Sequence, residues 1–291
     1  MTNWIETYRG TVPPWQCDVT EHFTVAYYFD RLEEAETTLA DELGLGELLR
    51  GGGFVRRMDL RFARELRAGT SFHVISAPLG INLDGTTLDF RLGHRFIDSA
   101  TGDTVTWVDA HWELSAAHVS SRQRDAIGGR LALWDGPVAE QRPDPTTKAG
   151  FIATARGRVR PADLDAEGRF SLSGIVHRFS SANGHAAVAM GMDTAYMQLN
   201  RRGFSTFEMA IRVSGSLRLD EPYLVKTGIA HLGNSSLRLI HRMVHARNGT
   251  DIARLSQFGV NLDLDARRPA PWPDEIRARA AALVVPVSSN G

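Results

Sequence analysis

Trp15–Tyr28, with the sequence WQCDVTEHFTVAYY, links a polar loop to the start of an amphipathic segment. Asp18 and His22 stand four residues apart in this loop, and Thr24 follows shortly after. Backbone N–H groups in the first turn of a helix lack intrahelical acceptors and favour an anion or a developing negative charge. A carboxylate, an imidazole and such N–H groups are therefore expected close together, an arrangement that suits acid–base or nucleophilic chemistry.

A helix is predicted directly after this loop. Its apolar residues recur at helical spacing, at Val25, Tyr28, Phe29, Leu32, Ala35, Leu39 and Leu43. Thr24 suits the N-cap position, and Gly44 and Gly46 suit the helix end. Charged residues fill most of the other face, so we expect Glu33 and Glu34 to be solvated or interfacial.

Strands surround this helix in the sequence. Before the loop, Glu6–Val12 reads as a short strand. After three glycines the hydrophobic period changes to two, with Met58, Leu60 and Phe62 alternating with polar residues and Val55 expected on the polar side. The predicted strands of this run are Phe54–Phe62, Ser71–Ala77, Thr87–Ile97 and Asp103–Leu114. One long helix followed by antiparallel strands is typical of an α+β fold.

The same order of elements returns in the second half. It gives a predicted strand, a helix, four strands and a terminal helix at Ile152–Val159, Leu172–Met192, Phe204–Leu217, Tyr223–Ile229, Ser236–Val244, Asp251–Leu264 and Asp274–Leu283. An offset of 147 residues relates His94 to His241, and the same offset relates Asp18 to Asp165. This indicates an internal duplication. We therefore predict a domain at 1–119, a linker at 120–150 with a helical piece near 122–133, and a second domain at 151–291.

Composition restricts the function classes. The chain has 291 residues, a formal net charge of −1, 43% hydrophobic and 23% charged residues. These values predict a soluble globular protein and argue against nucleic acid as the main partner. The single cysteine, Cys17, excludes an internal disulfide and a multi-thiolate metal site and fits a reducing cytoplasm. We find neither a signal peptide pattern nor a membrane-spanning apolar run, and we expect no metal and no cofactor.

The loop and the duplication resemble a known family. Residues 16–28 are similar to the D-x-D-x-x-G-H-x-N-N-x-x-Y signature of the 4-hydroxybenzoyl-CoA thioesterase branch of the hotdog fold, in which a sheet wraps around one central helix. The departures are Gln16, Glu21, Thr24 and Val25, which replace the first Asp, the Gly and the two Asn. Residues 163–169, DLDAEGR, also resemble the signature, with Arg169 in place of the His. The resemblance implies two tandem hotdog domains that form a pseudo-dimer.

That family also implies roles for particular residues. The second Asp of the signature acts as nucleophile or general base on a thioester, and the residue seven positions later offers its N–H to the carbonyl. Carried over, Asp18 pairs with Val25 and Asp165 with Leu172. The expected catalytic residues are Asp18, His22, Thr24, Val25 and Asp165. The expected substrate-binding residues are Tyr28, His177 at the position matching Asp30, and cations that would contact coenzyme A phosphates, namely Arg56, Arg57, Arg201 and Arg202.

The implied activity is hydrolysis of an acyl-CoA or acyl carrier protein thioester in the cytoplasm. We expect neither nucleic acid nor a membrane as a partner, and a homodimer is possible. Two alternatives stay open. Hotdog hydratases and dehydratases carry a D-x-N-P-x-H pattern, whereas here the Asp18–His22 step is shorter and Glu21 stands between them. A non-catalytic module that binds acyl ligands is the other alternative, because neither copy matches the signature fully.

Overall fold

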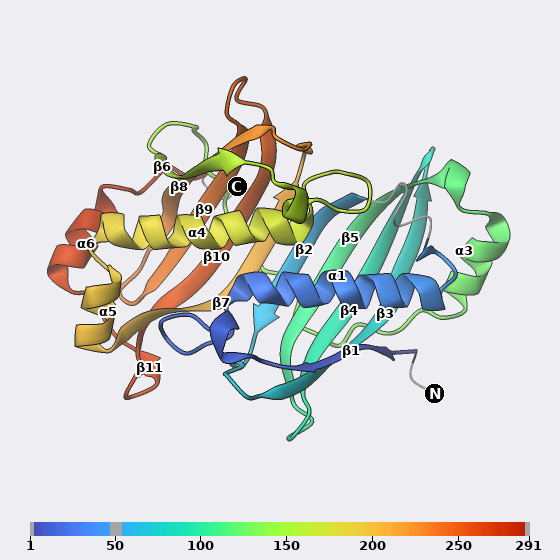
Figure 1. Ribbon diagram of the computed structural model, residues 1–291, viewed down its shortest axis with the longest axis horizontal. Helices are drawn as coiled ribbons and strands as arrows, with labels where there is room; N and C mark the ends of the chain where they lie inside the picture. The colour runs from blue at the N-terminus through green and yellow to red at the C-terminus, as the bar shows by residue number, and fades with distance from the viewer. Residues whose placement is uncertain (1–2, 47–53, 289–291) are drawn as a thin grey trace. The chain divides into compact units, whose positions relative to one another are not determined.

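The computed structural model describes residues 3–46 and 54–288, and these form two compact units (Figure 1). Unit 1 contains the chain up to Val138 together with Asp165–Ser173. Unit 2 contains Ala139–Leu164 and the chain from Gly174 onward. The segment Asp165–Ser173 thus packs with the first unit although it follows the linker in sequence.

Unit 1 is one long helix on an antiparallel sheet. Its elements are β1 (Ile5–Thr11), α1 (Val25–Glu42), β2 (Phe54–Phe62), β3 (Ser71–Asp84), β4 (Thr87–Asp98) and β5 (Thr104–Ser115). The strands lie in the order β1-β3-β4-β5-β2. Phe29, Leu32 and Leu39 of α1 are fully buried, as their spacing predicts. Thr24 does occupy the N-cap, though its side chain makes no capping hydrogen bond, and Gly44 at φ +69° follows the helix end.

One prediction for β2 is wrong. Val55 is buried rather than turned to the polar side of the strand. The register of β2 against β5 shifts between Val55 and Arg57, which is a β-bulge that interrupts the strict alternation of faces. The predicted alternation from Met58 onward is correct, because Met58, Leu60 and Phe62 are all buried.

Unit 2 repeats the helix-on-sheet arrangement. Its elements are β6 (Ile152–Arg158), α4 (Leu172–Met190), α5 (Thr194–Asn200), β7 (Arg202–Val213), β8 (Pro222–Leu232), β9 (Ser236–His245), β10 (Asp251–Asp263), β11 (Arg268–Pro269) and α6 (Asp274–Ala281). The strands lie in the order β7-β10-β9-β8-β6, with β11 on β10. The sequence pattern does not predict the short elements α5 and β11. Met190 and Met192 join a core cluster with Trp272.

The duplication extends to buried polar side chains. In unit 1, His94 Nδ1 lies 2.7 Å from Ser76 Oγ, which lies 2.7 Å from Thr7 Oγ1. In unit 2, His241 Nδ1, Thr227 Oγ1 and Thr154 Oγ1 form the same chain with the same distances. Each chain joins three neighbouring strands of its own sheet. The predicted tandem repeat is therefore confirmed at the level of individual side chains.

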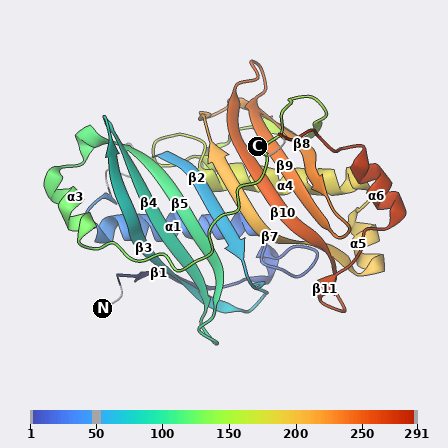
Figure 2. The same ribbon diagram turned by 180° about the vertical axis from the view of Figure 1, so that it is seen from behind.

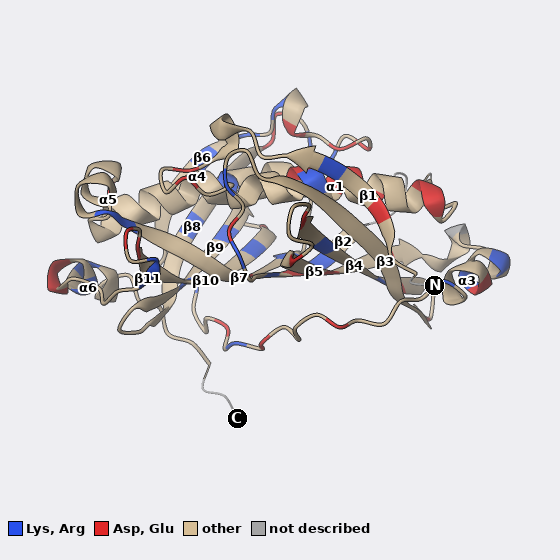
Figure 3. Ribbon diagram, turned by 90° about the horizontal axis from the view of Figure 1, so that it is seen from below, with Lys and Arg blue, Asp and Glu red and all other residues tan. Residues whose placement is uncertain are grey.

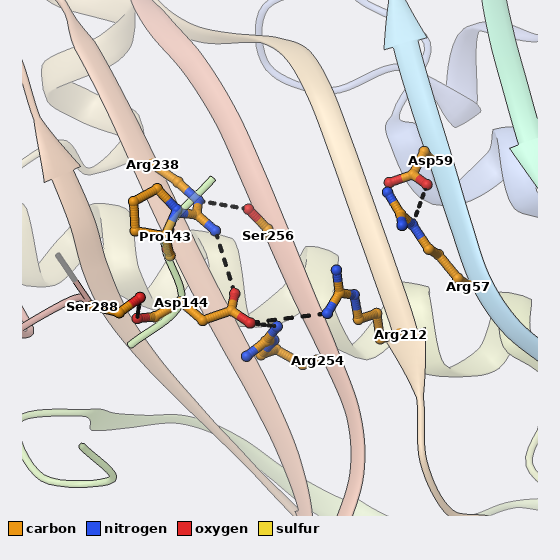
Figure 4. A network of polar contacts seen from close by, with 9 residues as sticks. All are labelled: Arg57, Asp59, Pro143, Asp144, Arg212, Arg238, Arg254, Ser256 and Ser288. Carbon is orange, nitrogen blue, oxygen red and sulfur yellow. Dashed lines mark hydrogen bonds and ion pairs between the residues drawn. The ribbon is translucent and has the colours of Figure 1, made fainter. Parts of the chain in front are cut away.

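The linker contains α3 (Ser121–Gly128), which is shorter than the helical piece predicted there. Beyond α3 the linker runs along the sheet faces opposite to α1 and α4 (Figures 2 and 3). Figure 4 shows how Asp144 holds it on unit 2, 2.6 Å from Arg254, with Arg238 and Arg212 at 3.8 and 3.9 Å. Burial lowers the pKa of Arg238 to about 10, and Asp144 opposes this shift.

Candidate active site

The loop before α1 is a tight hairpin that brings Asp18 beside the helix start. The Asp18 N–H donates to His22 O at 2.8 Å, and the Glu21 N–H donates to Asp18 O at 3.0 Å. Cys17 forms a β-bridge with Phe23 next to this pair. The first residues of α1 therefore follow directly from the strand-like end of the loop.

The loop before α4 has the same backbone. The Asp165 N–H donates to Arg169 O at 2.8 Å, and the Gly168 N–H donates to Asp165 O at 3.0 Å. Glu21 and Gly168 occupy equivalent positions and share a left-handed conformation, with φ of +66° and +69°. The family signature has Gly at this position, and Glu21 adopts the same conformation despite its side chain.

The carboxylates of Asp18 and Asp165 differ in the hydrogen bonds that their Oδ2 atoms accept. Asp18 Oδ1 accepts the N–H of Thr20 at 2.8 Å and that of His22 at 3.2 Å. Asp165 Oδ1 accepts two N–H groups in the same way. Asp165 Oδ2, however, accepts a hydrogen bond from Arg169 Nε at 2.8 Å. The Asp18 side chain is exposed, and every hydrogen bond that it accepts from the described residues goes to Oδ1. The Asp18 carboxylate is the more accessible of the two.

A chain of side chains extends from Asp18 into the protein. The Thr20 hydroxyl lies 2.6 Å from Asp18 Oδ1 and 2.9 Å from His22 Nδ1. His22 Nε2 lies 3.0 Å from Glu65 Oε2, just after β2, and His22 is 8% exposed. The Thr20 hydroxyl can donate to only one of its two neighbours at a time, so its direction depends on which His22 nitrogen carries hydrogen.

Glu65 and Thr20 were not predicted as site residues. Thr20 lies within the predicted loop, but a threonine between Asp and His carries no distinctive signal. Glu65 lies 43 residues beyond His22 in sequence, and no local pattern connects the two. A carboxylate that holds the second nitrogen of a histidine fixes the ring orientation.

The start of α1 offers donors beside Asp18. The Tyr27 N–H donates to Thr24 O at 2.9 Å. Within the part of the chain that the structure describes, the N–H groups of Val25 and Ala26 make no hydrogen bond. These are first-turn N–H groups of an 18-residue helix, so they can stabilise an oxyanion.

The start of α4 differs, because a side chain of α1 occupies one of its donors. The Ser173 N–H donates to Glu33 Oε1 at 2.8 Å, and the Ser173 hydroxyl donates to Asp30 Oδ1. Burial raises the pKa of Glu33 to about 7; the Ser173 N–H opposes the rise, and three nearby carboxylates, Glu36, Asp30 and Asp165, add to it. Glu33 is half-buried and contacts the start of α4, which fits the interfacial alternative of the expectation, whereas Glu34 is exposed and pairs with Arg31.

The cations predicted to contact phosphates all have acidic partners. The pairs are Arg56–Glu113, Arg57–Asp59, Arg201–Asp265 and Arg202–Asp263. Tyr28 is 2% exposed and packs against Phe23 and Phe96, and burial raises its pKa. His177 lies on α4 and is partly exposed. The substrate-binding roles of these residues stay predictions.

Within residues 3–46 and 54–288, no group of three or more His, Cys, Asp or Glu side chains could hold a metal ion. None of the helices in this range is long and apolar enough to cross a membrane.

Comparison with known proteins identifies related sequences and folds. The family model of the Thioesterase-like superfamily matches residues 159–280. A search of the curated proteins found no match. Among solved structures, the chain resembles the putative oleoyl thioesterase from Lactobacillus plantarum with a TM-score of 0.64 at 12% identity, covering 88% of this chain and 96% of that chain.

Two further structures are similar over nearly the whole chain. The 12:0-ACP thioesterase from Umbellularia californica has a TM-score of 0.63 at 14% identity and covers 89% of this chain and 94% of its own. An acyl-ACP thioesterase from Bacteroides thetaiotaomicron VPI-5482 has a TM-score of 0.58 at 11% identity, with 87% and 96% covered. The predicted α+β double hotdog fold is confirmed.

Proposed function

We propose that this double hotdog protein is a thioesterase and hydrolyses an acyl thioester at Asp18, beside the first N–H groups of α1. The observation that carries the proposal is the Asp18–Thr20–His22–Glu65 chain, whose links measure 2.6, 2.9 and 3.0 Å. It fixes one oxygen of Asp18 through Thr20 and leaves the other oxygen toward solvent. A fixed, accessible carboxylate next to oxyanion donors is what thioester hydrolysis requires.

In the mechanism, Asp18 Oδ2 acts as a general base. It removes a proton from a water molecule as the water oxygen bonds to the thioester carbonyl carbon. The carbonyl oxygen becomes an oxyanion and accepts hydrogen bonds from the N–H groups of Val25 and Ala26. The tetrahedral intermediate then collapses, the C–S bond breaks, and the thiolate takes the proton back from Asp18.

His22 supports this step by controlling the Thr20 hydroxyl. When His22 donates from Nδ1 to Thr20 Oγ1, the Thr20 hydroxyl is directed at Asp18 Oδ1. Glu65 Oε2 lies 3.0 Å from His22 Nε2 and holds the imidazole ring in this orientation. Through this chain His22 holds the Asp18 carboxylate in one orientation while Oδ2 gains and loses a proton.

We infer that the first copy carries the activity. In the second copy, Arg169 replaces His22 and its Nε donates to Asp165 Oδ2, so the oxygen that would accept a proton from water is already occupied. Glu33 already occupies the Ser173 N–H there. Asp165 is therefore assigned a structural role in its loop.

The substrate is an acyl thioester of coenzyme A or of an acyl carrier protein. Two of the similar structures are named as ACP thioesterases, which supports a carrier-bound acyl group, and the acyl chain itself is left open. A further homodimer stays a prediction that gel filtration with light scattering tests.

The test compares Asp18→Asn with the matched variant Asp165→Asn. Thiol release from a panel of acyl-CoAs is followed with a thiol reagent, and circular dichroism verifies folding. We expect Asp18→Asn to lower kcat by about 10²-fold or more, as general-base loss does, while Asp165→Asn keeps at least half the rate. If folded Asp18→Asn releases thiol at the wild-type rate, the assignment of Asp18 is refuted. If the wild-type protein binds acyl-CoA and releases no thiol, the non-catalytic alternative is favoured.

A further inference from the structure

A turn after β2 holds one arginine at the edge of the Asp18 loop. The Phe23 N–H donates to Leu66 O at 2.8 Å, and His22 forms a β-bridge with Arg67. The turn closes with the Thr70 N–H donating to Arg67 O at 3.0 Å, and Gly69 adopts φ +84° within it. The backbone of Arg67 is thus fixed directly beside the residue that supports Asp18.

Among residues 3–46 and 54–288, the ion pair recorded for the guanidinium of Arg67 is a long one. Its Nη2 lies 3.9 Å from Glu65 Oε2, and that oxygen already lies 3.0 Å from His22 Nε2. The Arg67 side chain is 45% exposed. Arg64, three residues earlier, differs because its Nη1 lies 2.5 Å from Asp103 Oδ2. A guanidinium has five N–H donors in a planar fork, so Arg67 retains donors for a ligand at the loop edge.

Apolar surface lies on the same loop. Trp15 is 79% exposed and Val19 is 50% exposed, on either side of Cys17 and Asp18 in sequence. An exposed tryptophan in the Asp18 loop and an exposed arginine on the turn that pairs with this loop suit a ligand with an apolar flexible arm and an anionic group. The phosphopantetheine arm, which carries the thioester in both coenzyme A and acyl carrier proteins, has this chemistry.

We propose that Arg67 binds the phosphate of the phosphopantetheine arm and so makes the enzyme prefer phosphate-bearing thioesters over simple ones. This inference rests on the proposed function, since it assumes that the thioester reacts at Asp18. Arg67 is a specificity residue in this reading and takes no part in bond making. A bidentate, charge-assisted contact between guanidinium and phosphate provides the selectivity.

The test presents one acyl group on four thiols: N-acetylcysteamine, phosphopantetheine, coenzyme A and an acyl carrier protein. The variants are Arg67→Ala, Arg67→Lys and the matched control Arg64→Ala. For Arg67→Ala we expect KM to rise about tenfold with the three phosphate-bearing substrates and to stay unchanged with the N-acetylcysteamine thioester. Arg67→Lys should recover part of the loss, Arg64→Ala should show none, and added salt should shrink the difference.

Three results overturn the proposal. The first is an equal rise of KM with all four substrates, which marks a structural role. The second is no rise with any of them. The third is a loss with coenzyme A alone, which assigns Arg67 to the nucleotide part instead. Failure of the proposed function is recognised separately, because Asp18→Asn would then hydrolyse the N-acetylcysteamine thioester at the wild-type rate.

Discussion

Replacing Glu33 with glutamine should change how the stability of the protein depends on pH. Burial raises the pKa of Glu33 from 4.5 to about 7. The folded state therefore binds a proton more tightly than the unfolded state between these values, and the stability of the wild type falls as pH rises from about 4.5 to 7. The shift corresponds to about 3 kcal/mol, and to roughly half of that once solvent screening of a partly exposed group is counted.

The glutamine side chain in the Glu33→Gln variant would keep a carbonyl oxygen to accept the Ser173 N–H and would carry no charge at any pH. The variant should match the wild type near pH 4.5 and exceed it by roughly 1.5–3 kcal/mol above pH 7. Urea unfolding at half-unit steps from pH 4.5 to 8.5 measures the difference. Glu34→Gln is the control, because Glu34 is exposed and pairs with Arg31 at 3.0 Å.

The decisive quantity is the slope of the stability difference between variant and wild type against pH. A difference that stays constant from pH 4.5 to 8.5 would show that Glu33 is not held in its protonated form by the fold. A difference of the opposite sign, with the variant less stable at high pH, would show that the ionised carboxylate and the Ser173 N–H form a net stabilising pair.

Two substitutions test other parts of the fold. Glu21→Gly should raise stability by roughly 0.5–1 kcal/mol, because φ +66° disfavours a side chain, whereas Glu21→Ala should bring no gain in thermal unfolding. Asp144→Asn should lower the free energy of unfolding by about 2 kcal/mol, because buried Arg238 loses its carboxylate partner. Glu140→Gln is the control, because Glu140 is exposed. A loss below about 0.5 kcal/mol in urea unfolding contradicts this interpretation.

Local periodicity was sufficient to predict most of the fold. The helical spacing of apolar residues gives α1 within a residue or two, and the period-two runs give β2, β4 and β5 almost unchanged. The repeat offset then predicts unit 2 from unit 1. Periodicity predicts the wrong face of the strand for Val55. The β-bulge there depends on how β2 pairs with β5, and the sequence of β2 alone does not indicate it.

The candidate site was only partly predictable. Asp18, His22 and the α1 start are near neighbours in sequence, so one motif contains them. Glu65 joins His22 from a distant turn, and Glu33 joins Ser173 from a different repeat. Such contacts depend on how strands and helices pack, which residue spacing does not encode. The sequence pattern also could not predict that the arginines expected to bind phosphate pair with carboxylates of the protein.

The segment Asp165–Ser173 has a consequence for any attempt to separate the repeats. It belongs to unit 1 by packing, yet it is synthesised after the linker. A protein truncated before it would keep the first helix and its complete sheet but would lose the amide and hydroxyl groups that contact Glu33 and Asp30. Glu33 and Asp30 would then lose these hydrogen-bond donors. We therefore expect each half of the protein, encoded by a gene cut at the linker, to express poorly alone. Co-expression of the two halves should restore the yield.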